Sequence, residues 1–300
     1  MRKLFLITTL SLIAFSVIFG AEKGSIKIEK GQKLIRKTEP EPTFLNDGVV
    51  LLKNVWDQTT ILQIIEEYDT ETLKIVRKYI PKNQPVIVLW HHVEGGRKKI
   101  GLFSEFPKLW SFINDIIAPK VRKFIVTQNE TLRLLETVIF SKPYKISNKI
   151  HWHQDTSTWP LKPNNQFAVW IPFEEVDKES GALHYALGSH KHGIRRSVEL
   201  STNKPYKDDK RKLIPAKPEK EGYIVKCMEM NPTDMLCHHG NTWHSSEPNK
   251  KSKRGRRGLS VRFIVGEAKF NPNPGQAATF VNQIEIKKGE KIEAKAFPTI

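Results

Sequence analysis

Cysteine is scarce in this sequence of 300 residues, and only Cys227 and Cys237 occur. Two cysteines cannot form the disulfide framework of a small exported domain. We expect two partly buried thiols, with a single disulfide as the alternative. Long apolar runs are also missing after the first 20 residues, so no later segment is predicted to cross a bilayer.

Acidic residues are outnumbered, with 32 Asp and Glu against 49 Lys and Arg, a formal net charge of +17 and a pI of about 9.7. Such a charge suits nucleic acid, a membrane surface or a phosphorylated substrate. Lys, however, outnumbers Arg and is scattered along the chain, whereas phosphate sites usually recruit Arg. We therefore expect no nucleic-acid partner, and we interpret the basic run KKSKRGRR as a solvated loop.

The N-terminus has the pattern of a signal peptide. Arg2 and Lys3 precede an uncharged stretch from Leu4 to Gly20, and small residues follow. We predict a signal peptide over residues 1–20, and hence a secretory, periplasmic or extracellular location. An uncleaved membrane anchor is the alternative. Residues 21–42 are polar and rich in charge, and we interpret them as a linker.

The rest of the chain, residues 43–300, is predicted to form one domain with helices first and strands later. Apolar residues three and four apart predict helices over 57–80 and 106–125. From about residue 133 to 268, short apolar runs alternate with turn residues, which is typical of a β sandwich or barrel. We expect a mainly β jelly-roll core with helical support. The charged segment 201–222 is predicted to be a long surface loop, and such loops are often functional lids.

Polar side chains alternate in the stretch IHWHQDTSTWP, residues 150–160. In an extended strand residues i and i+2 face the same way, so His153 and Asp155 project together, with His151 behind them. One imidazole and one carboxylate supply two adjacent ligands of a metal. A further His would complete the facial triad of non-haem Fe(II) oxygenases. We interpret His151 as a neighbour of the site rather than a ligand.

Two later segments offer the missing parts. LCHHGNTWHSSEPN follows a short strand-like run and contains His238, His239 and His244. Residues directly before a candidate ligand are more often packing residues, which is how we interpret His238 and His239. The segment RGRRGLSVRFIV then opens a buried-looking strand with a cation. A buried Arg needs an anionic partner, and a dicarboxylate co-substrate would supply one.

These segments resemble the phytanoyl-CoA dioxygenase (PhyH) family of Fe(II)- and 2-oxoglutarate-dependent oxygenases. The similar segments run through most of the chain after the linker. They are FLNDGVVLLKNV, ETVIFSKP, HWHQD, AVWIPFEEVDKESGALHYALGSHKHG, HSSEPNKKSKRGRRGLS and the terminal AFPTI. The resemblance implies a double-stranded β-helix (jelly-roll, cupin-like) fold and the cofactors Fe(II), 2-oxoglutarate and O2.

The resemblance also assigns residues. His153, Asp155 and His244 match the catalytic metal ligands, and Arg256 matches the residue that binds the distal carboxylate of 2-oxoglutarate. Arg257 is the alternative for that role. Trp170 and Ser246 match positions that line the co-substrate pocket, and His190 matches one that stabilises a turn.

The implied activity is hydroxylation of a small organic molecule with release of succinate and CO2. Asp155 is present, whereas halogenating relatives carry a small residue there, so a hydroxylase is expected. The alternatives are a fatty acyl-CoA α-hydroxylase and a non-catalytic relative that binds a metal or ligand. A peroxisomal Ser-Lys-Leu ending is not seen, which with the signal peptide disfavours the acyl-CoA substrate. We expect a monomer.

Overall fold

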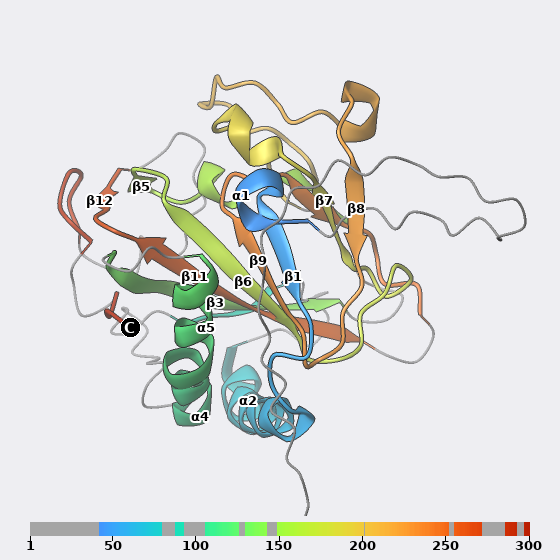
Figure 1. The fold of residues 1–300 in the computed structure, drawn as a ribbon, viewed down its shortest axis with the longest axis vertical. Coiled ribbons are helices and arrows are strands. Elements are labelled where there is room, and N and C mark those ends of the chain that lie inside the picture. The colour runs from blue at the N-terminus through green and yellow to red at the C-terminus, as the bar shows by residue number, and fades with distance from the viewer. Residues whose placement is uncertain are drawn as a thin grey trace, which may run out of the picture. The chain divides into compact units, whose positions relative to one another are not determined.

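Two antiparallel sheets form the centre of the fold in the computed structural model (Figure 1). The structure describes residues 42–79, 88–92, 106–125, 130–142, 149–200, 202–251, 255–271, 286–292 and 297–300. The predicted signal peptide and most of the linker lie outside these residues. All the described residues belong to one compact unit, residues 41–300. Among these described residues, no helix is both long enough and apolar enough to cross a bilayer.

The larger sheet has six strands in the order β1-β9-β6-β11-β3-β2, and the smaller sheet has four in the order β4-β10-β7-β8. The strands of the larger sheet are β1 (Val49–Leu52), β2 (Val88–His92), β3 (Leu132–Lys142), β6 (Gln166–Pro172), β9 (Met235–His239) and β11 (Arg256–Val265). Those of the smaller sheet are β4 (Ile150–His153), β7 (Leu183–Ala186), β8 (Val225–Met228) and β10 (His244–Ser246). A separate ribbon pairs β5 (Leu161–Lys162) with β12 (Lys269–Phe270). The mainly β fold expected from the sequence is confirmed, and the larger sheet also recruits β1 and β2 from before residue 133.

Alternation along β6 explains how the larger sheet is covered on both faces. Phe167, Val169 and Ile171 belong to one apolar cluster, together with residues of the helices. Trp170 belongs to another cluster, with Leu183 and Tyr185 of the smaller sheet. One face of the larger sheet therefore packs on helices, and the other faces the smaller sheet.

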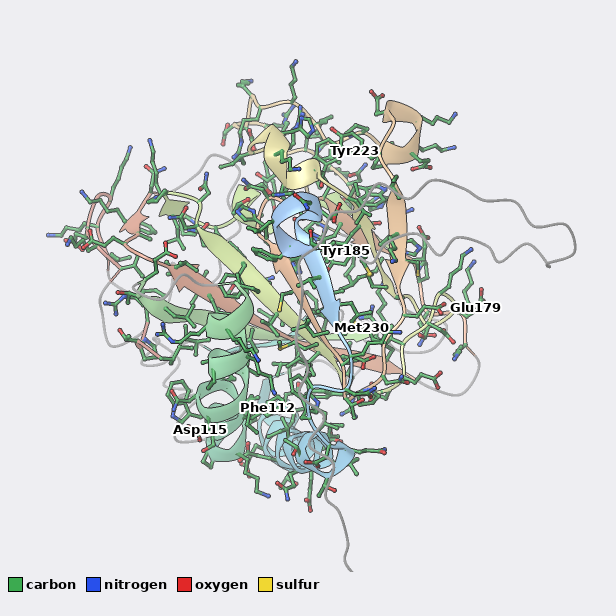
Figure 2. All side chains as sticks on the ribbon, viewed as in Figure 1. Phe112, Asp115, Glu179, Tyr185, Tyr223 and Met230 are labelled. Atoms are coloured by element: carbon green, nitrogen blue, oxygen red, sulfur yellow. The ribbon has the colours of Figure 1, made fainter. Side chains whose placement is uncertain are left out.

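The helices that cover the larger sheet are α2 (Gln58–Tyr79), α4 (Pro107–Ser111) and α5 (Ala118–Phe124), with a π-helical segment, Phe112–Ile117, between the last two. They lie side by side below the strands in Figure 1. Figure 2 shows Phe112 between the helical segments and Asp115 on their outer side. Phe112 is buried and its ring lies 4.9 Å from that of Trp56. Both helical regions predicted from apolar spacing are therefore present.

A four-residue helix, α1 (Phe44–Asp47), precedes β1 and was not predicted. Gly48 follows it in the left-handed region, with φ of 76°. A Cβ on Gly48 would lie 2.5 Å from Nδ1 of His190, so the turn packs directly on this imidazole. His190 Nε2 lies 3.3 Å from the carbonyl oxygen of Leu45. His190 therefore supports this turn, as the resemblance implied.

Part of the segment predicted as a surface loop, residues 201–222, is tied to the body of the domain by Asp209 and Arg211. Asp209 is buried and its carboxylate accepts hydrogen bonds from Ser197 N at 2.8 Å and Arg211 Nε. Arg211 also donates from Nη2 to the carbonyl of Ser157, at 3.3 Å. These contacts hold the segment against the stretch that carries Asp155. A lid function for it stays a prediction.

Candidate metal and co-substrate site

Three predicted ligands meet at the edge of the smaller sheet. His153 ends β4, Asp155 begins a single 3-10 turn (Asp155–Ser157), and His244 begins β10. Strands β4 and β10 are neighbours, and His244 pairs directly with His153. One donor atom of each of the three residues lies within 4.8 Å of the others. The sheet thus brings together residues that are distant in the sequence.

Each of the two imidazoles is held by a contact of Nδ1 with a backbone carbonyl, which leaves Nε2 available to bind a metal. Nδ1 of His153 lies 2.8 Å from the carbonyl oxygen of His151, and Nδ1 of His244 lies 2.9 Å from that of Thr242. A carbonyl only accepts, so Nδ1 carries the hydrogen and Nε2 presents its lone pair. Burial lowers the pKa of both His153 and His244, which keeps them neutral. Neutral imidazole is the form that binds a metal.

Asp155 completes the ligand set as a buried anion. Burial alone would raise its pKa, but the charge of Arg262 and the hydrogen bond from His238 lower the pKa well below the usual range. Nη2 of Arg262 lies 3.6 Å from Oδ1 of Asp155, and Nη1 bonds to the carboxylate of Glu136. Two neutral imidazoles and one carboxylate fit Fe(II), because this triad leaves positions open for other ligands.

A pocket extends from these ligands between the two sheets. Trp170, Ser246 and Arg256 line this pocket together with the metal-ligand candidates. The structure therefore brings all six predicted site residues to one cavity. Apolar parts of its wall come from Phe140, Ile150, Leu183 and Leu200.

Arg256 is buried at the start of β11 with little to satisfy its charge. Its Nη2 donates to the carbonyl of Gly181, and its guanidinium carbon lies 5.0 Å from the centre of the Trp170 ring. Burial lowers its pKa to about 10, so it remains a cation near neutral pH. No carboxylate among the described residues lies at ion-pair distance from it.

Two buried polar atoms in this part of the pocket lack partners among the described residues. They are Nε of Arg256 and Oγ of Ser246. Such atoms are rare in folded proteins and often point to an absent ligand. A carboxylate would accept from both, and one carboxylate of a 2-oxo dicarboxylic acid fits this requirement. The residues present therefore fit 2-oxoglutarate as well as iron.

Gly258 allows the indole of Trp170 to lie across β11. A Cβ on Gly258 would lie 2.0 Å from a ring carbon of Trp170. Any side chain there would displace the indole and the guanidinium of Arg256 that it faces. Glycine in a strand is used here for a close approach of side chain to backbone.

Arg257, the alternative for the co-substrate role, lies outside the pocket. It pairs with Glu174, with Nη2 2.7 Å from Oε1, and with Asp69. Adjacent residues of a strand face opposite sides of the sheet. Arg257 points away from the space between the two sheets, and Arg256 therefore points into it. The geometry places Arg256, and not Arg257, beside the other pocket residues.

Other candidates from the sequence lie elsewhere. His151 is half-buried and does not line the pocket, and His239 lies beside His190 with ring centres 5.7 Å apart. Cys227 and Cys237 are both free, as expected.

The position of His238 shows that our interpretation of it as a packing residue was wrong. Its Nε2 lies 3.0 Å from Oδ2 of Asp155. Arg262 and Tyr185 were not identified from the sequence at all. Alternation along β9 predicts that Leu236 and His238 lie on the same face of the strand. Only the pairing of β9 with β6 shows that Trp170 lies on that same face of the sheet. The sequence alone carried no signal for that register.

Known proteins resemble this chain, one in part of its sequence and others in their fold. The rice (Oryza sativa subsp. japonica) protein phytanoyl-CoA dioxygenase 1 is 27% identical over 135 residues, which cover 43% of this chain and 43% of the rice protein, less than half its length. The carbocyclase SnoK from nogalamycin biosynthesis, a non-haem α-ketoglutarate-dependent enzyme, superposes with a TM-score of 0.66 at 20% identity, covering 86% of this chain and 93% of SnoK.

A second similar structure is the epimerase SnoN in complex with Fe3+, α-ketoglutarate and nogalamycin RO. Its TM-score is 0.63 at 15% identity, with 85% of this chain and 95% of SnoN covered. These likenesses establish the fold. The family profile described as phytanoyl-CoA dioxygenase (PhyH) matches residues 44–258, a span that includes the three ligand candidates and Arg256. The expected resemblance is therefore confirmed, and the chain belongs to the phytanoyl-CoA dioxygenase (PhyH) family.

Proposed function

We propose that this protein is an Fe(II)- and 2-oxoglutarate-dependent dioxygenase that hydroxylates a small organic molecule and releases succinate and CO2. One observation carries the proposal. A single pocket has two imidazoles and a carboxylate within 4.8 Å of one another, and it also holds polar atoms of Arg256 and Ser246 that lack a partner in the described part of the chain. A metal and a dicarboxylate would satisfy both sets of atoms.

Each residue then has a defined role. His153, Asp155 and His244 hold the metal on one face and leave its other positions to small ligands. Arg256 and Ser246 bind the distal carboxylate of the co-substrate, and Trp170 lines the co-substrate site. When bound, iron and 2-oxoglutarate supply the oxidising chemistry, and the protein supplies orientation and exclusion of water. Ile150, Leu183 and Leu200 give the pocket an apolar wall, which suits a substrate that presents a C–H bond.

A metabolite screen can identify the substrate. The similar structures include a carbocyclase and an epimerase, so the fold accommodates outcomes other than hydroxylation. The rice relative is named for an acyl-CoA substrate. A screen should therefore contain acyl-CoA esters beside free acids and small metabolites.

Release of succinate from 2-oxoglutarate, measured with Fe(II) and oxygen, tests the proposal. We expect slow release without substrate, stimulation by the correct metabolite, and none from Asp155→Ala. A wild-type protein that binds neither metal nor 2-oxoglutarate would contradict the enzymatic proposal. One that binds both without turnover under the whole screen would favour the non-catalytic alternative.

We also propose that the protein is exported through its N-terminal segment. The support is the charge pattern of residues 1–20. N-terminal sequencing of the protein from its natural host tests this. A mature chain that begins near residue 21 supports export with cleavage, whereas retention of Met1 in a membrane fraction favours the anchor.

A further inference from the structure

The two oxygens of Asp155 lie in different surroundings. Oδ1 lies 4.0 Å from Nε2 of His153 and 3.9 Å from Nε2 of His244, so it faces the position of the metal. Oδ2 lies 3.0 Å from Nε2 of His238, which belongs to β9 of the other sheet. Oδ1, which also lies 3.6 Å from Nη2 of Arg262, therefore faces the metal position, and Oδ2 is bonded to a third histidine.

His238 is itself held by a tyrosine. The hydroxyl of Tyr185, in β7, lies 3.1 Å from Nδ1 of His238. An ionised carboxylate can only accept, so Nε2 of His238 donates to Asp155. In the neutral ring Nδ1 then accepts from the hydroxyl of Tyr185, an assignment that follows from the partners. The result is a chain of two hydrogen bonds from Tyr185 through His238 to Asp155.

Tyr185 and His238 also contact His244, one of the two histidine ligand candidates. The ring of Tyr185 stacks on that of His244, with centres 5.5 Å apart and planes inclined by 22°. The ring centre of His238 lies 4.7 Å from that of His244. Tyr185 and His238 are nearly excluded from solvent. Figure 2 shows Tyr185 within the body of the strands rather than at the surface.

We propose that Tyr185 and His238 are positioning residues that reserve Oδ2 of Asp155 and leave Oδ1 as its single metal-binding oxygen. A carboxylate that can rotate freely can bind a metal through both oxygens and occupy an additional coordination position. A bond to His238 prevents this, so that position stays available to the co-substrate or oxygen. This inference rests on the proposed function, because it assigns a role at the same site.

The test measures binding of Fe(II) to metal-free protein by calorimetry without oxygen, near neutral pH. His238→Leu removes the donor that orients Asp155. We expect roughly 10- to 100-fold weaker binding, because an unoriented carboxylate no longer presents Oδ1 to the metal beside the two imidazoles. His238→Gln keeps a donor at similar reach and should recover much of the affinity. Tyr185→Phe removes one hydroxyl and should weaken binding about 2- to 10-fold.

His239→Gln is the matched control. His239 follows His238 in β9, and its Nδ1 accepts from the backbone N of Asn241 instead of contacting Asp155. We expect its metal affinity to equal that of the wild type. Thermal unfolding of each metal-free variant separates folding from positioning.

The outcomes distinguish this inference from the proposed function. A wild type that binds no Fe(II) would overturn both. A wild type that binds, with His238→Leu and Tyr185→Phe that unfold at lower temperature yet bind equally well, would overturn the positioning role alone. Should His238→Leu fail to fold, an unchanged affinity of Tyr185→Phe would still overturn it, because that substitution removes the hydroxyl that holds His238.

Discussion

The metal end of the pocket and its arginine end are built in opposite ways. At the metal end, each ligand candidate is already tied to the protein through the atom that does not face the metal. Nδ1 of His153 and of His244 bonds to a carbonyl, and Oδ2 of Asp155 bonds to His238. At the arginine end, Nε of Arg256 and Oγ of Ser246 have no partner among the described residues.

This difference indicates which kind of ligand each end of the pocket binds. The metal end is a rigid set of donors whose orientation is fixed before a cation arrives. The arginine end contains donors whose burial is costly until an acceptor arrives. We therefore expect substitutions at the metal end to abolish function, and those at the arginine end to alter the affinity for the co-substrate.

The largest effect is expected from Asp155→Ala. It removes the anionic ligand, so Fe(II) affinity should fall by more than about 100-fold, because loss of a partner of a ligand alone costs up to that much. Succinate release should be lost with it. Asp209→Asn is the matched control, since Asp209 is also a buried carboxylate paired with an arginine, but it does not line the pocket. It should lower stability and leave metal affinity unchanged, as calorimetry and thermal unfolding would show.

The next effect is expected from Arg256→Gln compared with Arg257→Gln. Hydrogen bonds to a charged group contribute about 1.5–3 kcal/mol, so removal of the Arg256 guanidinium should raise the Kd of 2-oxoglutarate roughly 10- to 100-fold. Arg257→Gln breaks ion pairs with Glu174 and Asp69 outside the pocket and should not change this Kd. Equal effects of the two substitutions would contradict the assignment of Arg256.

A smaller effect, with an informative sign, is expected from Ser246→Ala. One hydrogen bond to a charged group is lost, so the Kd of 2-oxoglutarate should rise roughly 10-fold, near the lower end of the effect expected for Arg256→Gln. The free protein, however, loses a buried hydroxyl that has no partner among the residues described, so its melting temperature should stay the same or rise. A fall in melting temperature with unchanged affinity would show that the hydroxyl supports the fold rather than the ligand.

The sequence predicted the architecture and the ligands more fully than their surroundings. Alternation in β6 and the pair His153 and Asp155 are local patterns with a period of two residues, which can be recognised without knowledge of the fold. The role of His238 depends on the register between β9 and β6, and that of Arg262 on the pairing of β11 with β3. Such contacts join distant parts of the chain, so no local pattern identifies them.

The smallest effect concerns pH at the metal end. Each imidazole with an ordinary pKa of about 6.5 is half protonated at that pH, so two such ligands would weaken metal binding about fourfold between pH 8 and 6.5.

Burial lowers the pKa of His153 and His244, and the pKa of Asp155 also lies below its usual range, so all three stay in their metal-binding forms over this interval. We expect the Fe(II) affinity to change less than about twofold there and to fall only in more acidic solution. The same shifts lower the stability of the metal-free protein as pH falls below about 6.5, because the unfolded chain then binds more protons. A fourfold loss of affinity by pH 6.5 would mean that the two imidazoles are as accessible to protons as free histidine, and that the metal end is less enclosed than its hydrogen bonds indicate.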